Sequence, residues 1–214
     1  MLGRIRSLLA KNDGPYTMMD AHDDWNLLAI GGLNLAHVAW WFGLVATNGP
    51  ALQFLFYADC AYMLADCCWL LFVPSCVMPR VRGTLLVHHL TCIACMPVAA
   101  GNHTFMKHLL RTWSVEVHSW NHIASRRFSK LTFLSYINKP LFVMLRLIGF
   151  PLTWFAYARD RVALAPAVRE AMLPATLHWP LTVTHIGMYG LMLKWGMPIL
   201  QEAYFWLVPH RKKE

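Results

Sequence analysis

The chain has 214 residues, of which 57% are hydrophobic and 14% charged, and its formal net charge is +8. Soluble domains typically carry about 25% charged residues, so this composition predicts an integral membrane protein. The positive charge does not indicate nucleic-acid binding, because no segment offers a basic folded face. We therefore expect no nucleic-acid partner.

Six apolar segments approach the roughly 20 residues that a membrane-spanning helix needs. They are residues 25–46, 51–73, 84–100, 105–123, 139–158 and 177–207. The sequence lacks the strand and turn signals of a barrel, so helices are expected to satisfy the backbone. We predict an all-α polytopic membrane bundle of about six transmembrane helices. This domain, 25–208, would lie between a basic N-terminal juxtamembrane segment, 1–24, and a basic tail, 209–214.

Basic residues in the loops predict the orientation. Twelve Lys and Arg residues fall in the N-terminal segment, the 74–83 loop, the 124–139 loop and the tail, against four on the opposite side. By the positive-inside rule, both termini face the cytosol. The RKKE tail is similar to a dibasic retrieval signal, which indicates the endoplasmic reticulum or another endomembrane. The basic, acid-free start leaves the mitochondrial inner membrane, with both termini in the matrix, as an alternative.

The second apolar segment carries Asp59 and Asp66 on one helical face, with Tyr62 between them. A carboxylate at the bilayer centre costs at least about 2–3 kcal/mol unless it is paired or protonated. The third segment contains His88 and His89 in an otherwise apolar stretch. Imidazole is poorly tolerated in hydrocarbon, so the pair indicates a functional site. The alternative is that both histidines face a polar neighbour or the headgroup layer and only orient the helix.

Cysteine usage favours neither disulfides nor a metal. All six cysteines lie in or beside membrane segments, which argues against a secreted disulfide framework. His88, Cys92 and Cys95 share one helical face and are soft-metal ligand types. A closed site would need a fourth ligand from another helix, so we predict no metal.

The fourth segment carries Glu116, His118 and Asn121 and is expected to face the protein interior. An antiparallel bundle would bring Asp66, Glu116 and one or both of the paired histidines toward one cavity. A histidine beside a carboxylate is a base of fixed tautomer, able to take a proton from an amine or hydroxyl nucleophile. Alternatively, these groups satisfy one another and hold the bundle together, at about 1 kcal/mol per interhelical polar bond.

Three runs of the sequence resemble the TLC domain (TRAM–Lag–CLN), a family of polytopic lipid proteins that includes the ceramide synthases. The runs are FYADCAYMLADCCWLL, LLVHHLTCIACMPVAAG and RTWSVEVHSWNHIASRRF, which lie within roughly residues 54–128, about a third of the chain. The positions that carry the resemblance are Tyr62 with Asp66, the His88-His89 pair followed by Thr91, and Glu116 before an Asn and basic residues.

The resemblance implies a helical barrel around a lipid-sized cavity with the histidine pair inside. In the ceramide-synthase branch it implies acyl transfer from acyl-CoA to a sphingoid amine, without a cofactor. His88 or His89 would act as general base or transient acyl acceptor, oriented by Asp66 or Glu116. The predicted contacts to the acyl-CoA phosphates are Arg80 and Arg82.

The chain departs from that branch, because VEVHSWNHI contains Glu116 but no Asp. It is more similar to the compact TLC-domain proteins linked to membrane lipid composition. We therefore expect a protein that binds a membrane lipid, a long-chain acyl or sphingoid lipid, and leave open whether it is an acyl-CoA-dependent N-acyltransferase. Tyr62, Thr91, His118 and Asn121 complete the predicted ligand-binding residues.

Two other classes of function remain open. Histidines 37, 89, 118 and 185 lie on four different predicted helices, and paired membrane histidines can ligate a b-type haem. The chain could also be a non-catalytic subunit of a larger membrane protein complex. Its ten Trp and eleven Phe residues would supply interface and membrane-boundary surface to such partners.

Overall fold

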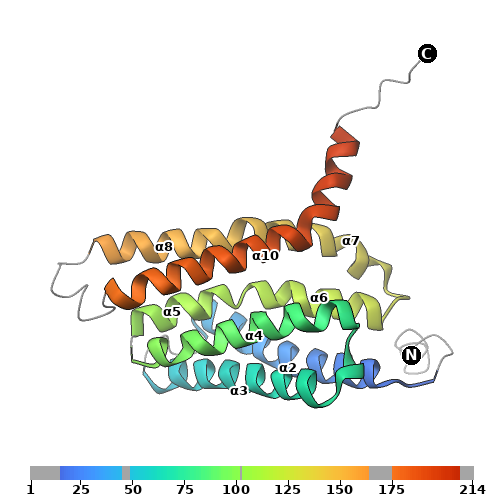
Figure 1. The fold of residues 1–214 in the computed structure, drawn as a ribbon, viewed down its shortest axis with the longest axis horizontal. Coiled ribbons are helices and arrows are strands. Elements are labelled where there is room, and N and C mark those ends of the chain that lie inside the picture. Colours follow the sequence, from blue (N-terminus) through green and yellow to red (C-terminus); the bar gives the residue numbers. More distant parts are fainter. Residues whose placement is uncertain (1–14, 45–48, 102, 164–174, 208–214) are drawn as a thin grey trace.

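A computed structural model describes residues 15–44, 49–101, 103–163 and 175–207. Its elements are α2 (Met18–Trp41), α3 (Pro50–Phe72), the 3₁₀ turn η1 (Pro74–Cys76), α4 (Pro79–Ala100), α5 (His103–Thr112), α6 (Val115–Arg127), α7 (Thr132–Leu141), the π-helical η2 (Phe142–Gly149), α8 (Phe150–Val162) and α10 (Ala175–Leu207). The described residues contain no strand, so the predicted all-α fold is confirmed. The helices run back and forth along the bundle, with α5–α6 forming one pass and α7–η2–α8 another (Figure 1).

Apolar side chains cover much of the outside of this bundle, and polar ones lie inside. In the described part of the chain, Pro50–Phe72, Pro79–Ala100 and Thr132–Val162 are long and apolar enough to cross a membrane. Leu28 and Phe155 are at least 68% exposed, whereas the described residues bury fourteen polar or charged side chains. Apolar outside and polar inside is the distribution that a helical membrane protein requires.

Helix α2 begins earlier than the expected residue 25. Thr17 caps it, because its hydroxyl accepts a hydrogen bond from the backbone N–H of Asp20 while the Asp20 carboxylate accepts one from the backbone N–H of Thr17. This capping box satisfies two backbone donors at the start of the helix. The additional turns carry His22 into the bundle.

The expected 105–123 segment is two helices, α5 and α6, joined by tight turns. The N–H of Trp113 donates to the carbonyl of Leu110 at 3.2 Å, and the N–H of Glu116 donates to the carbonyl of Trp113 at 2.8 Å. Both bonds reach back three residues instead of four, which overwinds the chain locally. Glu116 consequently lies in the first turn of α6, and the Trp113 indole donates to Asn34 on α2 at 3.2 Å.

The expected 139–158 segment is longer in the structure, because α7, η2 and α8 form one helical stretch from Thr132 to Val162. Its centre is π-helical, and π-turns are frequent at functional sites. Pro151 follows this centre and has no N–H to donate to the Leu147 carbonyl. The hydroxyl of Tyr189 on α10 donates to that carbonyl instead, at 3.1 Å.

Helix α10 covers residues 175–207, close to the expected 177–207. Pro180 and Pro198 were expected to kink or trim this segment. The helix continues through both, and toward its C-terminal end it bends and projects from the bundle (Figure 1). Pro198 lies toward the C-terminal end of α10 and removes one backbone hydrogen bond there.

Candidate functional site

A cavity of about 390 Å³ lies inside the bundle, in the half that contains the start of α2 and the α6–α7 turn. Residues of α2, α3, α4, α6, α7 and η2 form its wall, and α10 contributes Trp195 and Ile199. Six of the predicted site residues line this cavity: Tyr62, Asp66, His88, His89, Glu116 and His118. The structure therefore brings together most of the polar residues that the sequence pattern singled out.

Asp66 is the centre of a polar cluster from three helices. Its Oδ1 lies 2.6 Å from Nε2 of His22 on α2, and its Oδ2 lies 3.1 Å from Nδ1 of His89 on α4. Asn26 Nδ2 lies 3.0 Å from the same His22 nitrogen, and the Tyr62 hydroxyl donates to Asn26 Oδ1 at 2.7 Å. One carboxylate thus faces two imidazoles and orients both.

The contact between His89 and Asp66 is an ion-pair contact without the geometry of a hydrogen bond. It nevertheless sets which nitrogen of the imidazole faces the carboxylate. Because Nδ1 faces Asp66, Nε2 is the ring nitrogen that this carboxylate leaves uncontacted. This is the arrangement expected of an oriented histidine base.

His88 and Glu116 lie next to this cluster and line both this cavity and a second one. His88 Nε2 is 3.9 Å from Glu116 Oε1, a long contact, and His88 Nδ1 has no hydrogen-bond partner among the described residues. The His88 ring is edge-on to Trp195, with centroids 6.3 Å apart. This pair is therefore less tightly held than Asp66 and its histidines.

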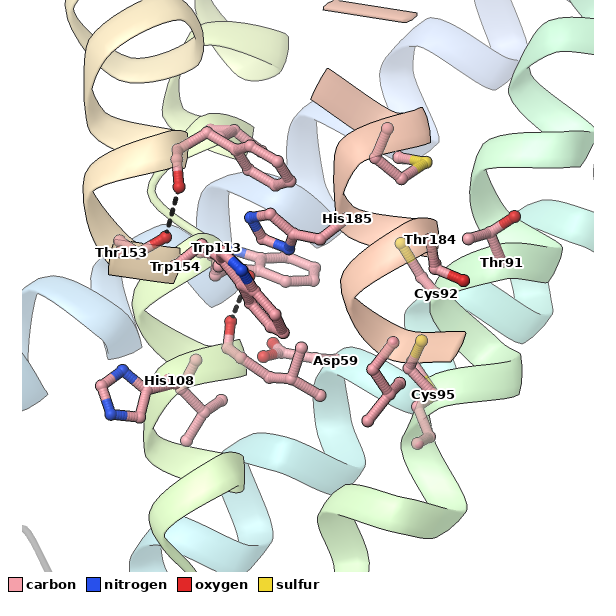
Figure 2. A pocket seen from close by; sticks show the side chains of 18 of the residues that line it. Asp59, Thr91, Cys92, Cys95, His108, Trp113, Thr153, Trp154, Thr184 and His185 are labelled. Carbon is pink, nitrogen blue, oxygen red and sulfur yellow. Dashed lines mark hydrogen bonds between the residues drawn. The ribbon is translucent and has the colours of Figure 1, made fainter. Parts of the chain in front are cut away.

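The second cavity has a volume of about 120 Å³ and lies toward the other end of the bundle. Figure 2 shows residues that line it, among them Asp59, Thr91 and His185. Most of its lining is apolar, and Thr91 lies here instead of beside the Asp66 cluster. Asp59 also lines it, and both oxygens of this carboxylate lie within 3.2 Å of His37 Nε2. Asp59 and Asp66 thus belong to the walls of different cavities.

Three predicted site residues lie outside both cavities. The Asn121 amide donates to the Leu134 carbonyl at 3.0 Å and to Asn138 at 3.2 Å, which joins α6 to α7. Arg82 donates from Nε to the carbonyl of Leu70 at 2.7 Å. Arg80 is exposed at the start of α4. These contacts hold helices together, and the two arginines lie at the same end of the bundle as the larger cavity.

Other residues of the larger cavity were not singled out from the sequence. His22 and Asn26 lie at the start of α2, in and just after the segment expected to be juxtamembrane. Arg146 on η2 also lines the cavity, and it donates to Ser119 on α6 at 2.5 Å. A charged residue near the middle of an apolar segment is itself a signal, and it marks Arg146 in the sequence.

The histidines considered for haem have different neighbours. His89 and His118 line the larger cavity, His185 lines the smaller one, and His37 lines neither. The His185 ring is stacked on Phe150 and on Trp154, with centroids 4.1 and 4.6 Å away (Figure 2). The described residues also contain no group of three or more His, Cys, Asp and Glu side chains arranged to hold a metal.

Comparison with protein families, with curated proteins and with solved structures found no match to this chain. The geometry and chemistry of the cavity are therefore the basis for proposing a function.

Proposed function

We propose that this chain is an integral membrane lipid-binding protein of the TLC type, which holds a long-chain acyl or sphingoid lipid inside its helical bundle. One observation carries the proposal: the 390 Å³ cavity is lined by the Asp66 cluster and enclosed by helices with apolar outer faces. Ligand pockets typically measure about 300–1,000 Å³ and combine an apolar lining with a few polar groups.

The linings of the two cavities favour an amphipathic ligand. The larger cavity contains the Asp66 cluster, whereas the smaller one combines apolar residues such as Phe105, Met188 and Met192 with Asp59, His108 and His185. His88 and Glu116 belong to both walls. A lipid with its polar head beside Asp66 and its chain directed toward the smaller cavity matches both environments.

Two further features support a TLC-type assignment and a membrane location. Tyr62, Asp66, His89 and Glu116, which carry the resemblance, surround one cavity although they come from three helices. The two basic loops of the described chain, 74–83 and 124–139, lie at one end of the bundle (Figure 1). We propose that both termini face the cytosol at the endoplasmic reticulum or another endomembrane. The mitochondrial inner membrane, with the termini in the matrix, is the alternative.

Native mass spectrometry of gently extracted protein tests lipid binding. We expect a lipid adduct on the parent protein that is lost in the His88→Ala/His89→Ala double variant. The variant His103→Ala is the control, because His103 is exposed at the start of α5 and lines neither cavity. A multi-subunit assembly without any histidine-dependent adduct would contradict the proposal and assign the chain to a structural subunit.

The contact between His89 and Asp66 favours acyl transfer as a second candidate function. In this reaction an amine nitrogen attacks the thioester carbonyl, a C–N bond forms, and the C–S bond to coenzyme A breaks. His89 Nε2 would take the amine proton and return it to the leaving thiolate, while Asp66 orients the ring. No cofactor is needed for this step.

The acyl-transfer candidate is tested with purified protein, an acyl-CoA and a sphingoid base. The expected products are an N-acyl lipid and free coenzyme A, formed about 10²–10⁴-fold more slowly by His89→Ala. Product formation no faster than without protein would exclude this candidate and leave lipid binding intact.

A further inference from the structure

Arg146 is a buried charge without a carboxylate in direct contact. It lies near the middle of the Thr132–Val162 stretch, its side chain is in the wall of the larger cavity, and the residue is 6% exposed. Among the described residues, no Asp or Glu oxygen lies within 4.0 Å of its guanidinium. Its Nε has no hydrogen-bond partner there.

Two neighbours fix the guanidinium without neutralising it. One terminal nitrogen donates to Ser119 Oγ at 2.5 Å, and the guanidinium carbon lies 5.6 Å from the centroid of the Trp195 ring. Neither neighbour carries a negative charge. Removing an unpaired guanidinium from water is costly, so a site that keeps one has to gain from an anion that binds there.

The carboxylates of the same cavity have other partners. Asp66 faces His22 and His89, and Asp23 accepts from Arg126 at 2.6 Å. Glu116 makes only a long contact with His88, at 3.9 Å, and acts on Arg146 from beyond 4.0 Å. None of these carboxylates therefore forms an ion pair with the guanidinium of Arg146.

Unpartnered imidazole nitrogens lie in the wall of the same cavity. Both ring nitrogens of His118 are buried without a hydrogen-bond partner in the described chain, and so is Nδ1 of His88. Three side chains of this wall, Arg146, His88 and His118, thus carry buried nitrogens that can donate to an anion. A phosphate group has enough oxygens to use them, and arginine binds phosphate through paired N–H groups.

We infer that Arg146 binds the phosphate of the lipid headgroup in the larger cavity, with His118 as a second contact. This inference rests on the proposed lipid-binding function and makes it specific: the ligand is a phosphate-bearing long-chain lipid. The chain of that lipid would extend past His88 toward the smaller cavity. The same chemistry would also accept a free phosphate ion, so the experiment must separate the two sources.

Competition between two lipids of equal acyl chains tests the inference. Purified protein in neutral detergent is incubated with phosphatidic acid and with diacylglycerol, which lacks only the phosphate, and native mass spectrometry measures the retained lipid. The parent should retain phosphatidic acid about tenfold better, the difference expected for one charge-assisted phosphate contact. Arg146→Gln should remove this preference, and Arg146→Lys should keep part of it.

The matched control is Arg159→Gln. Arg159 is exposed at the end of α8, pairs with its neighbour Asp160 and lines neither cavity, so this variant should keep the full preference. Inorganic phosphate in millimolar excess should leave the lipid bound. Displacement of the lipid by phosphate alone would assign the site to a free ion and overturn the lipid part of the inference.

Thermal unfolding separates binding from a structural role of Arg146. Without lipid, Arg146→Gln should unfold at or above the temperature of the parent, because it removes an unpaired buried charge. Phosphatidic acid should raise the unfolding temperature of the parent and not that of the variant. A variant that is less stable without lipid but shows the same lipid-induced rise would overturn the inference.

The outcome of the competition also distinguishes failure of the phosphate site from failure of lipid binding. Equal retention of both lipids by the parent would overturn the phosphate site and leave lipid binding in place. Retention of neither lipid, together with no adduct in the extracted protein, would overturn lipid binding itself.

Discussion

The side chain of Asp66 joins three helices through two imidazoles. His22 comes from α2 and His89 from α4, and all three side chains are buried. A buried carboxylate is stable only when its oxygens have partners, and here each oxygen faces a different histidine. The same contacts that satisfy Asp66 therefore fix the geometry of the cavity wall. Structure and ligand binding depend on the same residues at this point.

A matched pair of substitutions on α2 separates these two roles. His22 and His37 are both buried and both contact a carboxylate of α3, but only His22 lines the larger cavity. Each change to Gln should lower stability by about 1–3 kcal/mol, because a buried carboxylate loses a hydrogen-bond partner. Only His22→Gln should also reduce lipid retention, measured by native mass spectrometry. Equal loss of lipid in both variants would show that the effect is structural.

Acid should weaken the contact between the start of α2 and the end of α6. Asp24 precedes the apolar part of α2 and accepts from Arg127 at 2.6 and 3.2 Å. Hydrogen bonds from Arg127 lower the pKa of the Asp24 carboxyl below its ordinary value. The stabilisation is therefore present above the ordinary pKa of about 3.9 and is lost as pH falls through the lower folded-state value.

Unfolding temperatures of the parent and of Asp24→Asn test this pH dependence. The parent should be more stable at about pH 7, and the difference should narrow toward about pH 3 as Asp24 is protonated. A difference that stays constant over this range would mean that the charge of Asp24 contributes nothing to the contact.

Residue patterns predicted the carboxylate and histidine part of the site but not all of its neighbours. Asp66, His89 and Glu116 stand out because ionisable groups are rare in apolar segments. His22 was assigned to a juxtamembrane segment, since the aspartates around it lower the hydropathy of that stretch. In the structure, the Thr17 capping box starts α2 earlier, so His22 lies in the bundle and contacts Asp66.

At the scale of elements, α2 packs closely against α6 in the region of the cavity. A Cβ atom added to Gly31 would lie 2.9 Å from Trp120 Nε1, and this indole donates to the Leu27 carbonyl at 3.0 Å. The absence of a side chain at Gly31 allows the indole to reach the α2 backbone. A larger residue would separate the two helices that carry His22 and Glu116.

Adjacent glycines provide the test of this contact. Gly31→Ala should destabilise the protein by about 1–3 kcal/mol, the usual cost of overpacking. A Cβ at Gly32 meets no atom within 4 Å, so Gly32→Ala should be neutral or stabilising by up to about 1 kcal/mol. Thermal unfolding in one detergent measures both. Similar effects of the two substitutions would contradict the close packing of α2 on α6.

Segment lengths were predicted well where hydropathy decides them and poorly where local backbone geometry does. The second apolar segment, 51–73, corresponds closely to α3, Pro50–Phe72. The division of 105–123 into α5 and α6 depends on three-residue turns at Trp113, and no Gly or Pro marks that position. The π-helical centre of Thr132–Val162 was likewise not predicted, because hydropathy does not distinguish a π-helix from an α-helix.

Across the whole molecule, the start of α2, the α3–α4 turn, the α6–α7 turn and the end of α10 lie at one end of the bundle (Figure 1). An even number of passes places both chain ends on the same side of a membrane. Epitope tags at the two termini should therefore become accessible to antibody together when only the plasma membrane is permeabilised. Accessibility of one tag alone would contradict this topology.

The central claim is that a lipid lies inside the bundle, and photo-crosslinking tests it most directly. A long-chain lipid with a diazirine in its acyl chain is added to the reconstituted protein and activated, and the labelled peptides are mapped. The account predicts labels on residues that line the cavities, such as Met63, Met96 and Met192, and their loss in His88→Ala/His89→Ala. Labels confined to outward-facing residues such as Leu28, Phe54 and Phe155 would contradict it.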